Sequence, residues 1–537
     1  MTEEPESRRY LIDVDSASTP QLFCDCLVIG SGIAGLRAAI EASEKCRVIL
    51  VCKGNLTESN TQNAQGGIAS VLDKTDNFES HIADTLKAGC GLNDKHIVES
   101  VVRKAPQLIE QLIEWGTQFD TEAGRLAATL EGGHSRPRVL HAHGDETGRI
   151  LSETLINKVR SISNIRVMES FFVIDLLTDD QNRCTGVIGR SGKGYRIIWS
   201  ANTILASGGA GRLYRETTNP SIATGDGLAM AYRAGAVLQD LEFMQFHPTT
   251  LYVAGASRAL ITEALRGEGA RLVDGRGQPF MDNYHPDAEL APRDIVSRAI
   301  LTQMLTSGAT HVYLDARSLN KSYFSKRFPM INELCESFDI DVSRQLIPVR
   351  PSAHYMIGGV KTGEKTETSI EGLYACGEVA ATGLHGANRL GSNSLLEALA
   401  FGQIAGQIAL QTIKNTEKQF INYKIEPSGR SRLDTADVRN SLRAIMWRNV
   451  GITRWEKPLE EAQQIIRFWQ RYVMDKTFDS QNGWECQNML TLCLLMGRAA
   501  QQRQESRGVH YRRDFPDTDD VNFRKHIEIH RQDKRKL

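Results

Sequence analysis

The sequence predicts an α/β protein in which a Rossmann-like sheet is interrupted by an inserted segment and followed by a helical C-terminal region. The first observation is a G-x-G-x-x-G turn between an apolar strand, Leu27 to Ile29, and an alanine-rich helix. The second is another strand with glycine-rich turns, "EGLYACGEVAATGLHGANRLGSNSLLEALAFG", at residues 371–402. The third is apolar residues at three- and four-residue spacing in "SLRAIMWRNVGITR" and "LEEAQQIIRFWQRYVM", which predicts C-terminal helices with aromatic residues in the core.

The composition is that of an ordinary soluble enzyme. The chain has 537 residues, of which 41% are hydrophobic and 24% charged, so more than one domain is expected. The formal net charge of -1 argues against a nucleic-acid partner, which would require an extended basic face. Residues 1–23 form a polar arm without the apolar core of a signal peptide, and no run of apolar residues is long enough for a membrane helix. We therefore expect a cytoplasmic location and no membrane partner. The ten cysteines show no C-x-x-C pairs, so we expect reduced thiols and no metal site.

The first glycine-rich turn is suited to a pyrophosphate. Gly30, Gly32 and Gly35 allow a tight turn and close approach of the backbone, and the following helix presents free N–H groups at its N-terminus. This context favours dinucleotide binding over a merely tight turn. The second strand, "RVILVCKG", ends in Cys52 and Lys53 where an acidic residue would bind ribose hydroxyls. That departure makes a nicotinamide dinucleotide less favoured.

The second glycine-rich stretch leads into a helix that begins near Ser394. Two such helix N-termini can converge on one long cofactor. The two-part arrangement resembles flavoproteins that bind FAD in an extended pose. The alternative is a separate second α/β domain.

Residues able to bind a dicarboxylate appear in clusters between and within these elements: Gln245, His247, Thr262, Glu263, Arg266, Arg293, His354 and Arg389. Together these motifs resemble the flavoprotein subunit family of succinate dehydrogenase and fumarate reductase. The similarity runs from about Cys24 to "ESRGVHY", and it is greatest to the members that oxidise L-aspartate.

The resemblance implies a domain organisation. A Rossmann-like FAD-binding domain would comprise residues 24–241 and 356–415, interrupted by an α+β substrate-capping domain at residues 242–355. A helical domain would follow at residues 433–515, and the basic segment 516–537 is expected to be an exposed tail.

The resemblance also implies the cofactor contacts. The segment "ESNTQNAQGGIA" would wrap the flavin, and the respiratory members carry at the position of Asn60 a histidine that bonds covalently to it. An amide cannot act in this way, so FAD is expected to be held non-covalently. The expected FAD contacts are Gly30, Ser31, Gly32, Ile33, Ala34, Gly35, Lys53, Asn60, Thr61, Gln62, Asn63, Ala64, Gln65, Gly66, Gly67, Asp226, Glu378, Ser394 and Leu395. Without the resemblance, Asp226 would be an ordinary turn aspartate.

The implied activity is oxidation of L-aspartate to iminosuccinate, with the flavin reoxidised by O2, giving H2O2, or by fumarate. In the family's setting the product passes to quinolinate synthase for NAD biosynthesis. A soluble or membrane-attached succinate dehydrogenase or fumarate reductase flavoprotein is the alternative, which Asn60 disfavours. A non-catalytic flavin-binding scaffold would have no need of so complete a set of carboxylate-binding groups.

Individual roles follow from the resemblance. Arg389 and His354 would hold one substrate carboxylate, and His247 with Thr262 the other, with Gln245 beside them. Arg293 would be the proton donor and acceptor. Because a guanidinium rarely gives up its proton, a transient relay through Glu263 and Arg266 is expected, and a purely electrostatic clamp is the alternative.

Glu131, in "LEGGHSRPR", matches a glutamate of the aspartate-oxidising members. Its carboxylate could read the substrate ammonium, the group that distinguishes aspartate from succinate. The alternative is an exposed loop glutamate.

Overall fold

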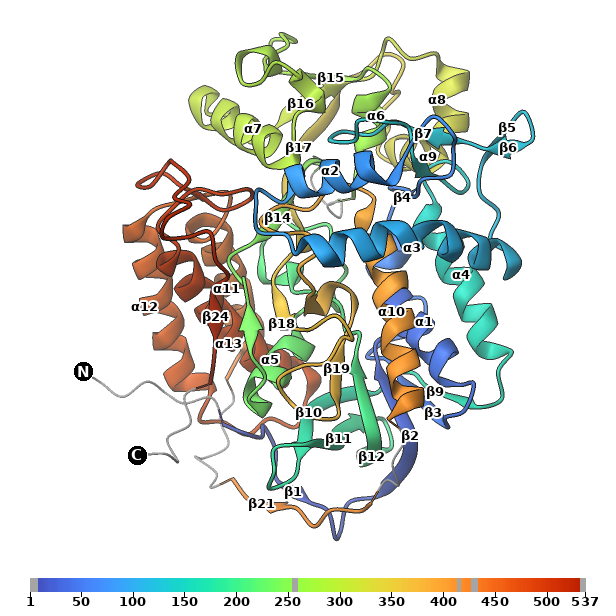
Figure 1. Cartoon of the computed structure of the whole chain (residues 1–537). Helices are drawn as coiled ribbons and strands as arrows, with labels where there is room; N and C mark the ends of the chain where they lie inside the picture. Colours follow the sequence, from blue (N-terminus) through green and yellow to red (C-terminus); the bar gives the residue numbers. More distant parts are fainter. Residues whose placement is uncertain (1–7, 254–258, 413–416, 426–432, 532–537) are drawn as a thin grey trace.

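The computed structural model describes residues 8–253, 259–412, 417–425 and 433–531. The described residues form a seven-stranded central sheet of order β10-β11-β12-β2-β3-β9, with β19 also paired to β12 (Figure 1). Strands β2, β3, β9, β12 and β19 pair in parallel, whereas β10, β11 and β12 pair antiparallel. Their bounds are β2 Gln21–Ile29, β3 Val48–Val51, β9 Ile165–Met168, β10 Phe172–Thr178, β11 Cys184–Ser191, β12 Gly194–Leu205 and β19 Leu373–Ala375.

The first glycine-rich turn joins β2 to α1, Ile33–Ala42. Gly30 has φ +119°, and a Cβ there would lie 2.1 Å from the carbonyl oxygen of Ala206, which follows β12. Only glycine can adopt this backbone conformation so close to the neighbouring strand. The predicted strand, turn and helix are confirmed, and the turn lies at the carboxyl edge of the sheet.

The second glycine-rich stretch belongs to the same domain as the first. Strand β19 pairs in register with Thr203 to Leu205 of β12, and α10, Asn393–Gln411, packs along α1. A Cβ at Gly402 would lie 2.6 Å from the carbonyl oxygen of Ala34, so the two helices approach closely. The alternative of a separate second α/β domain is therefore wrong.

An inserted α+β unit covers the top of this domain in Figure 1. Its antiparallel sheet has the order β14-β17-β16-β15, and its helices surround a separate apolar core. The bounds are β14 Met244–Leu251, α6 Glu263–Gly267, β15 Arg271–Val273, α7 Arg293–Ser307, β16 Val312–Asp315, α8 Lys321–Arg327, α9 Pro329–Glu336 and β17 Ile347–Met356.

The C-terminal region forms α11, Thr435–Asn449, α12, Glu456–Val473, and α13, Gln481–Gln502. Of these helices, red in Figure 1, α13 packs against α5, Asp226–Ala234, at one side of the central sheet, and α11 and α12 pack against α13. The expectation of buried aromatic residues is wrong for Phe468 and Tyr472 of α12, which are 53% and 52% exposed. They lie on the helix face opposite Ile466 and Val473, which point into the core.

Within the described residues, a segment near each end of the chain packs more closely than predicted. In the N-terminal arm, Tyr10, Leu11 and Ile12 are buried in a cluster with Trp199 and Trp484. Strand β24, Glu528–Ile529, pairs with β13, Leu238–Gln239, and Ile527 is buried, so this part of the expected tail is docked, although Glu528 and most of residues 516–531 are exposed as expected. In each segment, a few apolar residues within a mostly polar sequence pack against the rest of the protein.

The remaining elements flank these units. They are β1 Val14–Asp15, β4 Ile68–Ala69, α2 Phe78–Ala88, α3 Lys95–Glu114, β5 Thr121–Glu122, β6 Arg125–Leu126, β7 Ala128–Thr129, β8 Val139–Leu140, α4 Thr147–Arg160, β18 Gly359–Lys361, β20 Ala380–Ala381, β21 Asn422–Tyr423, β22 Thr453–Arg454 and β23 Tyr511–Arg512. Among the described residues, no helix combines the length and apolarity that crossing a membrane requires.

Candidate active site

A cavity of about 770 Å³ lies between the two glycine-rich elements. The predicted cofactor residues that line it are Gly30, Ser31, Gly32, Ile33, Ala34, Lys53, Asn60, Thr61, Asn63, Ala64, Gln65, Asp226, Glu378, Ser394 and Leu395. The remaining four, Gly35, Gln62, Gly66 and Gly67, are outside its lining. Segments far apart in sequence thus meet around one space.

The N-terminus of α1 faces this cavity. Ile33 N–H donates to Thr61 Oγ1 at 3.3 Å, and Gly32 and Ala34 also line the wall. Unpaired N–H groups and the positive end of the helix dipole favour an anion such as a pyrophosphate here.

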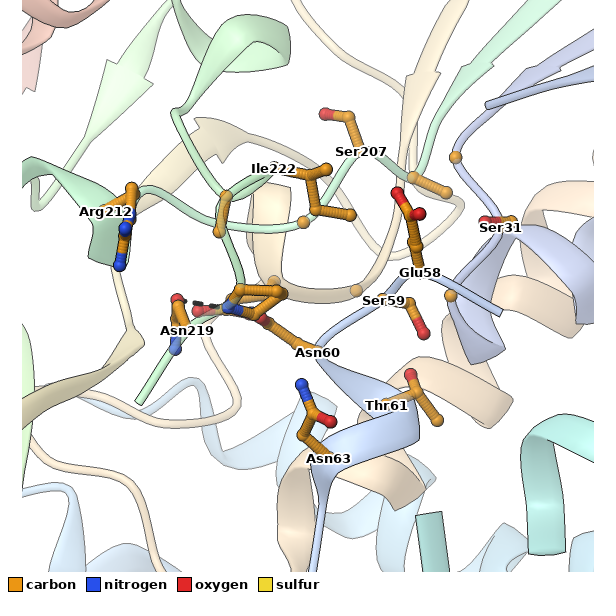
Figure 2. Close-up of a pocket in the computed structure, with 18 of the residues that line it drawn as sticks. Ser31, Glu58, Ser59, Asn60, Thr61, Asn63, Ser207, Arg212, Asn219 and Ile222 are labelled. Atoms are coloured by element: carbon orange, nitrogen blue, oxygen red, sulfur yellow. Dashed lines mark hydrogen bonds between the residues drawn. The ribbon is translucent and has the colours of Figure 1, made fainter. Parts of the chain in front are cut away.

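Polar atoms along the cavity wall fit a cofactor rich in hydroxyl and ring N–H groups. Asn60 Nδ2 donates to Glu378 Oε2 at 2.8 Å and to Asn219 Oδ1 at 3.3 Å, the latter drawn in Figure 2. In contrast, Asn60 Oδ1, Gln65 Oε1 and Ser207 Oγ are buried without a hydrogen-bond partner among the described residues. Since buried polar atoms are normally paired, these three fit contacts to a ligand such as FAD.

Lys53 stands at the end of β3 where an acidic residue was missing from the motif. Its Nζ lies 2.7 Å from each of Thr224 Oγ1, Asp226 Oδ2 and Glu485 Oε1. Burial alone would lower the pKa of Lys53, but the two carboxylates raise it above the usual value. The lysine is therefore held charged at the cavity wall, and Asp226 is its buried partner rather than a free turn residue.

Several lining residues were missed by the sequence reasoning. Figure 2 shows Ser207, Arg212 and Asn219 around the cavity, together with Glu58 and Ser59 of the segment that was expected to wrap the flavin. A usable signal existed for Ser207: it follows the buried strand β12, and the carboxyl ends of neighbouring parallel strands meet at one edge of a sheet. Arg212 lies in a one-turn 3-10 helix, Gly211–Leu213, and Asn219 in a loop, and neither position has a comparable sequence pattern.

The predicted dicarboxylate residues meet beside this cavity. Gln245 Oε1 accepts hydrogen bonds from Arg389 Nε at 3.2 Å, Arg389 Nη2 at 3.0 Å and Arg293 Nη1 at 3.4 Å. Its Nε2 donates to Asn388 Oδ1 and to the carbonyl oxygen of Arg389. Both the oxygen and the nitrogen of the Gln245 amide are hydrogen-bonded to other protein groups. Gln245 therefore bridges Arg293 and Arg389 and is not free to contact a substrate.

Arg389 carries a charge without a carboxylate partner. Its Nη1 donates to Ser394 Oγ at 2.6 Å, and its guanidinium lies 4.4 Å from the ring centroid of Tyr355. Within the described part of the chain, no carboxylate lies at ion-pairing distance from it. Burial and the nearby Arg293 lower the pKa of Arg389 to about 10, so it still carries its proton at neutral pH. Such a buried cation favours an anionic ligand.

Arg293, Glu263 and Arg266 form a connected chain, as the expected relay requires. Arg293 Nε donates to Glu263 Oε2 at 2.6 Å, and Arg266 Nη2 lies 3.6 Å from Glu263 Oε1. Arg266 is 2% exposed, and its Nη1 donates to the carbonyl oxygen of Glu289. Burial and the charge of Arg293 lower the pKa of Arg266, although Glu263 opposes this.

The two histidines face each other, with ring centroids 5.2 Å apart. Burial and the nearby arginines hold the pKa of both His247 and His354 well below the usual range, so both are neutral. His354 Nδ1 pairs with Thr218 Oγ1 at 2.9 Å, and His247 Nδ1 accepts from Thr249 N–H at 3.3 Å. Thr262 caps α6 by accepting from Ala264 N–H, so its hydroxyl proton can still be donated.

Glu131 is 3% exposed, so the alternative of an exposed loop glutamate is wrong. Ser392 Oγ donates to its Oε2 at 2.8 Å, and His141 Nε2 lies 3.2 Å from its Oε1. Burial alone would raise the pKa of Glu131, but the contacts with His141 and Ser392 lower it to about 2. The next residue, Gly132, lies against Glu263, which places Glu131 near the arginine chain.

Comparisons with known proteins agree with this arrangement. Residues 25–395 match the FAD binding domain family, and residues 439–537 match the fumarate reductase flavoprotein C-terminal family. An L-aspartate oxidase from Streptomyces coelicolor is 41% identical over 94% of this chain and 91% of its own length. One from Yersinia pestis is 41% identical over 93% of this chain and 97% of its own.

Solved structures show the same architecture. A quinol fumarate reductase structure from E. coli superposes with a TM-score of 0.88 at 32% identity, covering 95% of this chain and 94% of the other. Sdh1 of Mycobacterium smegmatis in complex with UQ1 gives a TM-score of 0.82 at 31% identity, covering 94% and 91%.

Proposed function

Because this chain belongs to the L-aspartate oxidase family, within the fumarate reductase flavoprotein fold, we propose that it oxidises L-aspartate to iminosuccinate with FAD as cofactor. The observation that carries this is a cluster of two arginines and two neutral histidines beside the cofactor cavity, with His354 and Ser394 lining that cavity. The expected consumer of the product is quinolinate synthase, in a route to NAD.

When bound, FAD would take up the hydride from the substrate α-carbon, and O2 or fumarate would then reoxidise it, O2 giving H2O2. Its contacts would come from the α1 N-terminus, Lys53, Glu378, Ser394 and the segment from Asn60 to Gln65 except Gln62.

The protein's own part begins with orientation. Arg389 and His354 would hold one carboxylate, and His247 with Thr262 the other, each neutral imidazole donating one hydrogen bond. Holding both ends fixes the α-hydrogen toward the cofactor cavity. Gln245 supports this by keeping Arg389 and Arg293 at a set separation.

Arg293 would move the proton that enters or leaves the substrate. Glu263 contacts it at 2.6 Å, so a proton can pass along a short hydrogen bond while Arg266 stabilises the carboxylate. Glu131 stays ionised at neutral pH and would accept a hydrogen bond from the substrate ammonium.

A direct assay tests the proposal. FAD-loaded protein is given L-aspartate, D-aspartate or succinate under air, and peroxide and imine are measured. We expect both products with L-aspartate alone. Reduction of the flavin by succinate but not by L-aspartate would favour a succinate dehydrogenase-type enzyme instead.

We expect acid precipitation to release all flavin into the supernatant. Asn60 donates to Glu378 and Asn219 and offers no nucleophilic nitrogen for a covalent bond. Flavin fluorescence is measured in the supernatant and in the denatured pellet, and fluorescence retained by the polypeptide would contradict non-covalent binding.

Glu131→Gln should strongly reduce kcat/KM for L-aspartate while leaving fumarate reduction nearly intact. The amide keeps the shape but loses the charge that would pair with the ammonium, a contact worth about 1.5 to 3 kcal/mol. Steady-state kinetics with both substrates measure the difference. Glu122→Gln, in the exposed strand β5, is the matched control. Equal losses of both activities would show that Glu131 does not read the amino group.

A further inference from the structure

The C-terminal helix α13 contacts the cofactor cavity wall from behind. Glu485 Oε1 accepts from Lys53 Nζ at 2.7 Å, and Asn488 Nδ2 donates to Asp226 Oδ1 at 2.6 Å. Lys53 and Asp226 both line the cavity, whereas Glu485 and Asn488 do not. The two helix residues therefore act on the cavity only through the lysine and the aspartate.

These contacts form one face of α13. Glu485 and Asn488 are three residues apart and so share a helix face. Leu492 continues it, because a Cβ at Gly225, the residue before Asp226, would lie 2.3 Å from Leu492 Cδ1. Polar and apolar contacts of the same face thus fix the start of α5 and the end of β3 together.

The network is buried and balanced in charge. Glu485 and Asn488 are 3% and 1% exposed. Glu485 also pairs with Arg439 of α11 at 3.3 Å, and Asn488 Oδ1 accepts from Arg233 Nη1 at 2.6 Å. Two cations and two carboxylates, Lys53 and Arg439 with Asp226 and Glu485, therefore neutralise each other; Glu485 is buried, and the other three side chains are largely buried. Removing one carboxylate leaves a buried positive charge uncompensated.

We propose that Glu485 and Asn488 are positioning residues of the cofactor site, through which FAD binding and docking of the C-terminal helices stabilise each other. The inference rests on the proposed FAD cofactor. Because coupling between two sites is reciprocal, a ligand that is bound better when α13 is docked must also hold α13 in place.

The test compares apoprotein variants. FAD is titrated into wild type, Glu485→Gln and Asn488→Leu, and the quenching of flavin fluorescence gives Kd. We expect Kd to rise on the order of tenfold in both variants. Glu460→Gln, an exposed carboxylate on α12 that makes the same change in net charge, should bind FAD as wild type does.

A second measurement separates positioning from general stability. Amide hydrogen exchange of residues 481–502 should slow on adding FAD to wild type, and this FAD-dependent slowing should be reduced in Glu485→Gln. A merely structural role would lower the melting temperature equally with and without FAD and leave Kd unchanged, which would overturn the inference. Wild-type protein that bound no FAD would overturn the cofactor assignment as well.

Discussion

Replacing Arg293 by leucine is expected to lower kcat for L-aspartate by on the order of a thousandfold. The variant removes the group that would transfer the proton, and among the described residues it leaves Glu263 with the 3.6 Å contact to Arg266 as its ion pair. Rapid mixing of the oxidised variant with L-aspartate without oxygen measures flavin reduction directly, and mixing the reduced variant with fumarate measures reoxidation. Both rates should fall together, because the same proton position serves both directions.

Arg298→Leu is the matched control for this variant. Arg298 lies on the same helix, α7, but pairs with Asp294 and the carbonyl oxygen of Gly508, away from the pocket. Its kcat should stay near that of wild type. A similar, modest loss of kcat in both variants would mean that the substitutions disturb the structure of α7 and that Arg293 does not transfer the proton.

Arg389→Ala should weaken dicarboxylate binding by about 2 to 5 kcal/mol, because it deletes the buried cation that is proposed to hold one carboxylate. Spectral titration of the bound flavin with succinate or fumarate gives Kd, and steady-state kinetics give KM. KM should rise much more than kcat falls, unlike the Arg293 variant.

Arg389→Lys separates charge from geometry. The lysine keeps a positive charge but lacks the planar fork that contacts Gln245 and can pair two carboxylate oxygens. We expect binding between that of wild type and the alanine variant. Unchanged Kd in both variants would place the carboxylate elsewhere.

Local patterns predicted the fold well because each depends on neighbouring residues. The turn at Gly30 requires a strand before it, a helix after it and a residue without a side chain. All three features can be recognised within a few residues of the sequence. The sequence also showed that Lys53 stands where an acidic residue would be expected. The ion pairs of Lys53 could not be predicted, because its partners Asp226 and Glu485 lie in helices that are distant in the sequence.

The site residues show the same limit. Arg293 and Glu263 were predicted together from the family resemblance, and the structure brings them to 2.6 Å. Gln245 was predicted to touch substrate, yet its amide is filled by Arg389, Arg293 and Asn388, which only tertiary structure brings together. Likewise, the docking of Tyr10 to Ile12 depends on Trp199 and Trp484, so a polar composition alone misjudged that arm.

The close packing of α1 against α10 has a consequence for biosynthesis. Ala34 emerges from the ribosome early, but its partner Gly402 is added only after the whole inserted unit has been translated. The apolar face of α1 that packs against α10 therefore stays uncovered through most of synthesis. Large proteins are prone to aggregate at this stage. The cavity between the N-termini of α1 and α10 can bind a flavin only after α10 has been synthesised and has packed against α1. We therefore expect chaperone capacity during expression to affect the yield of active enzyme.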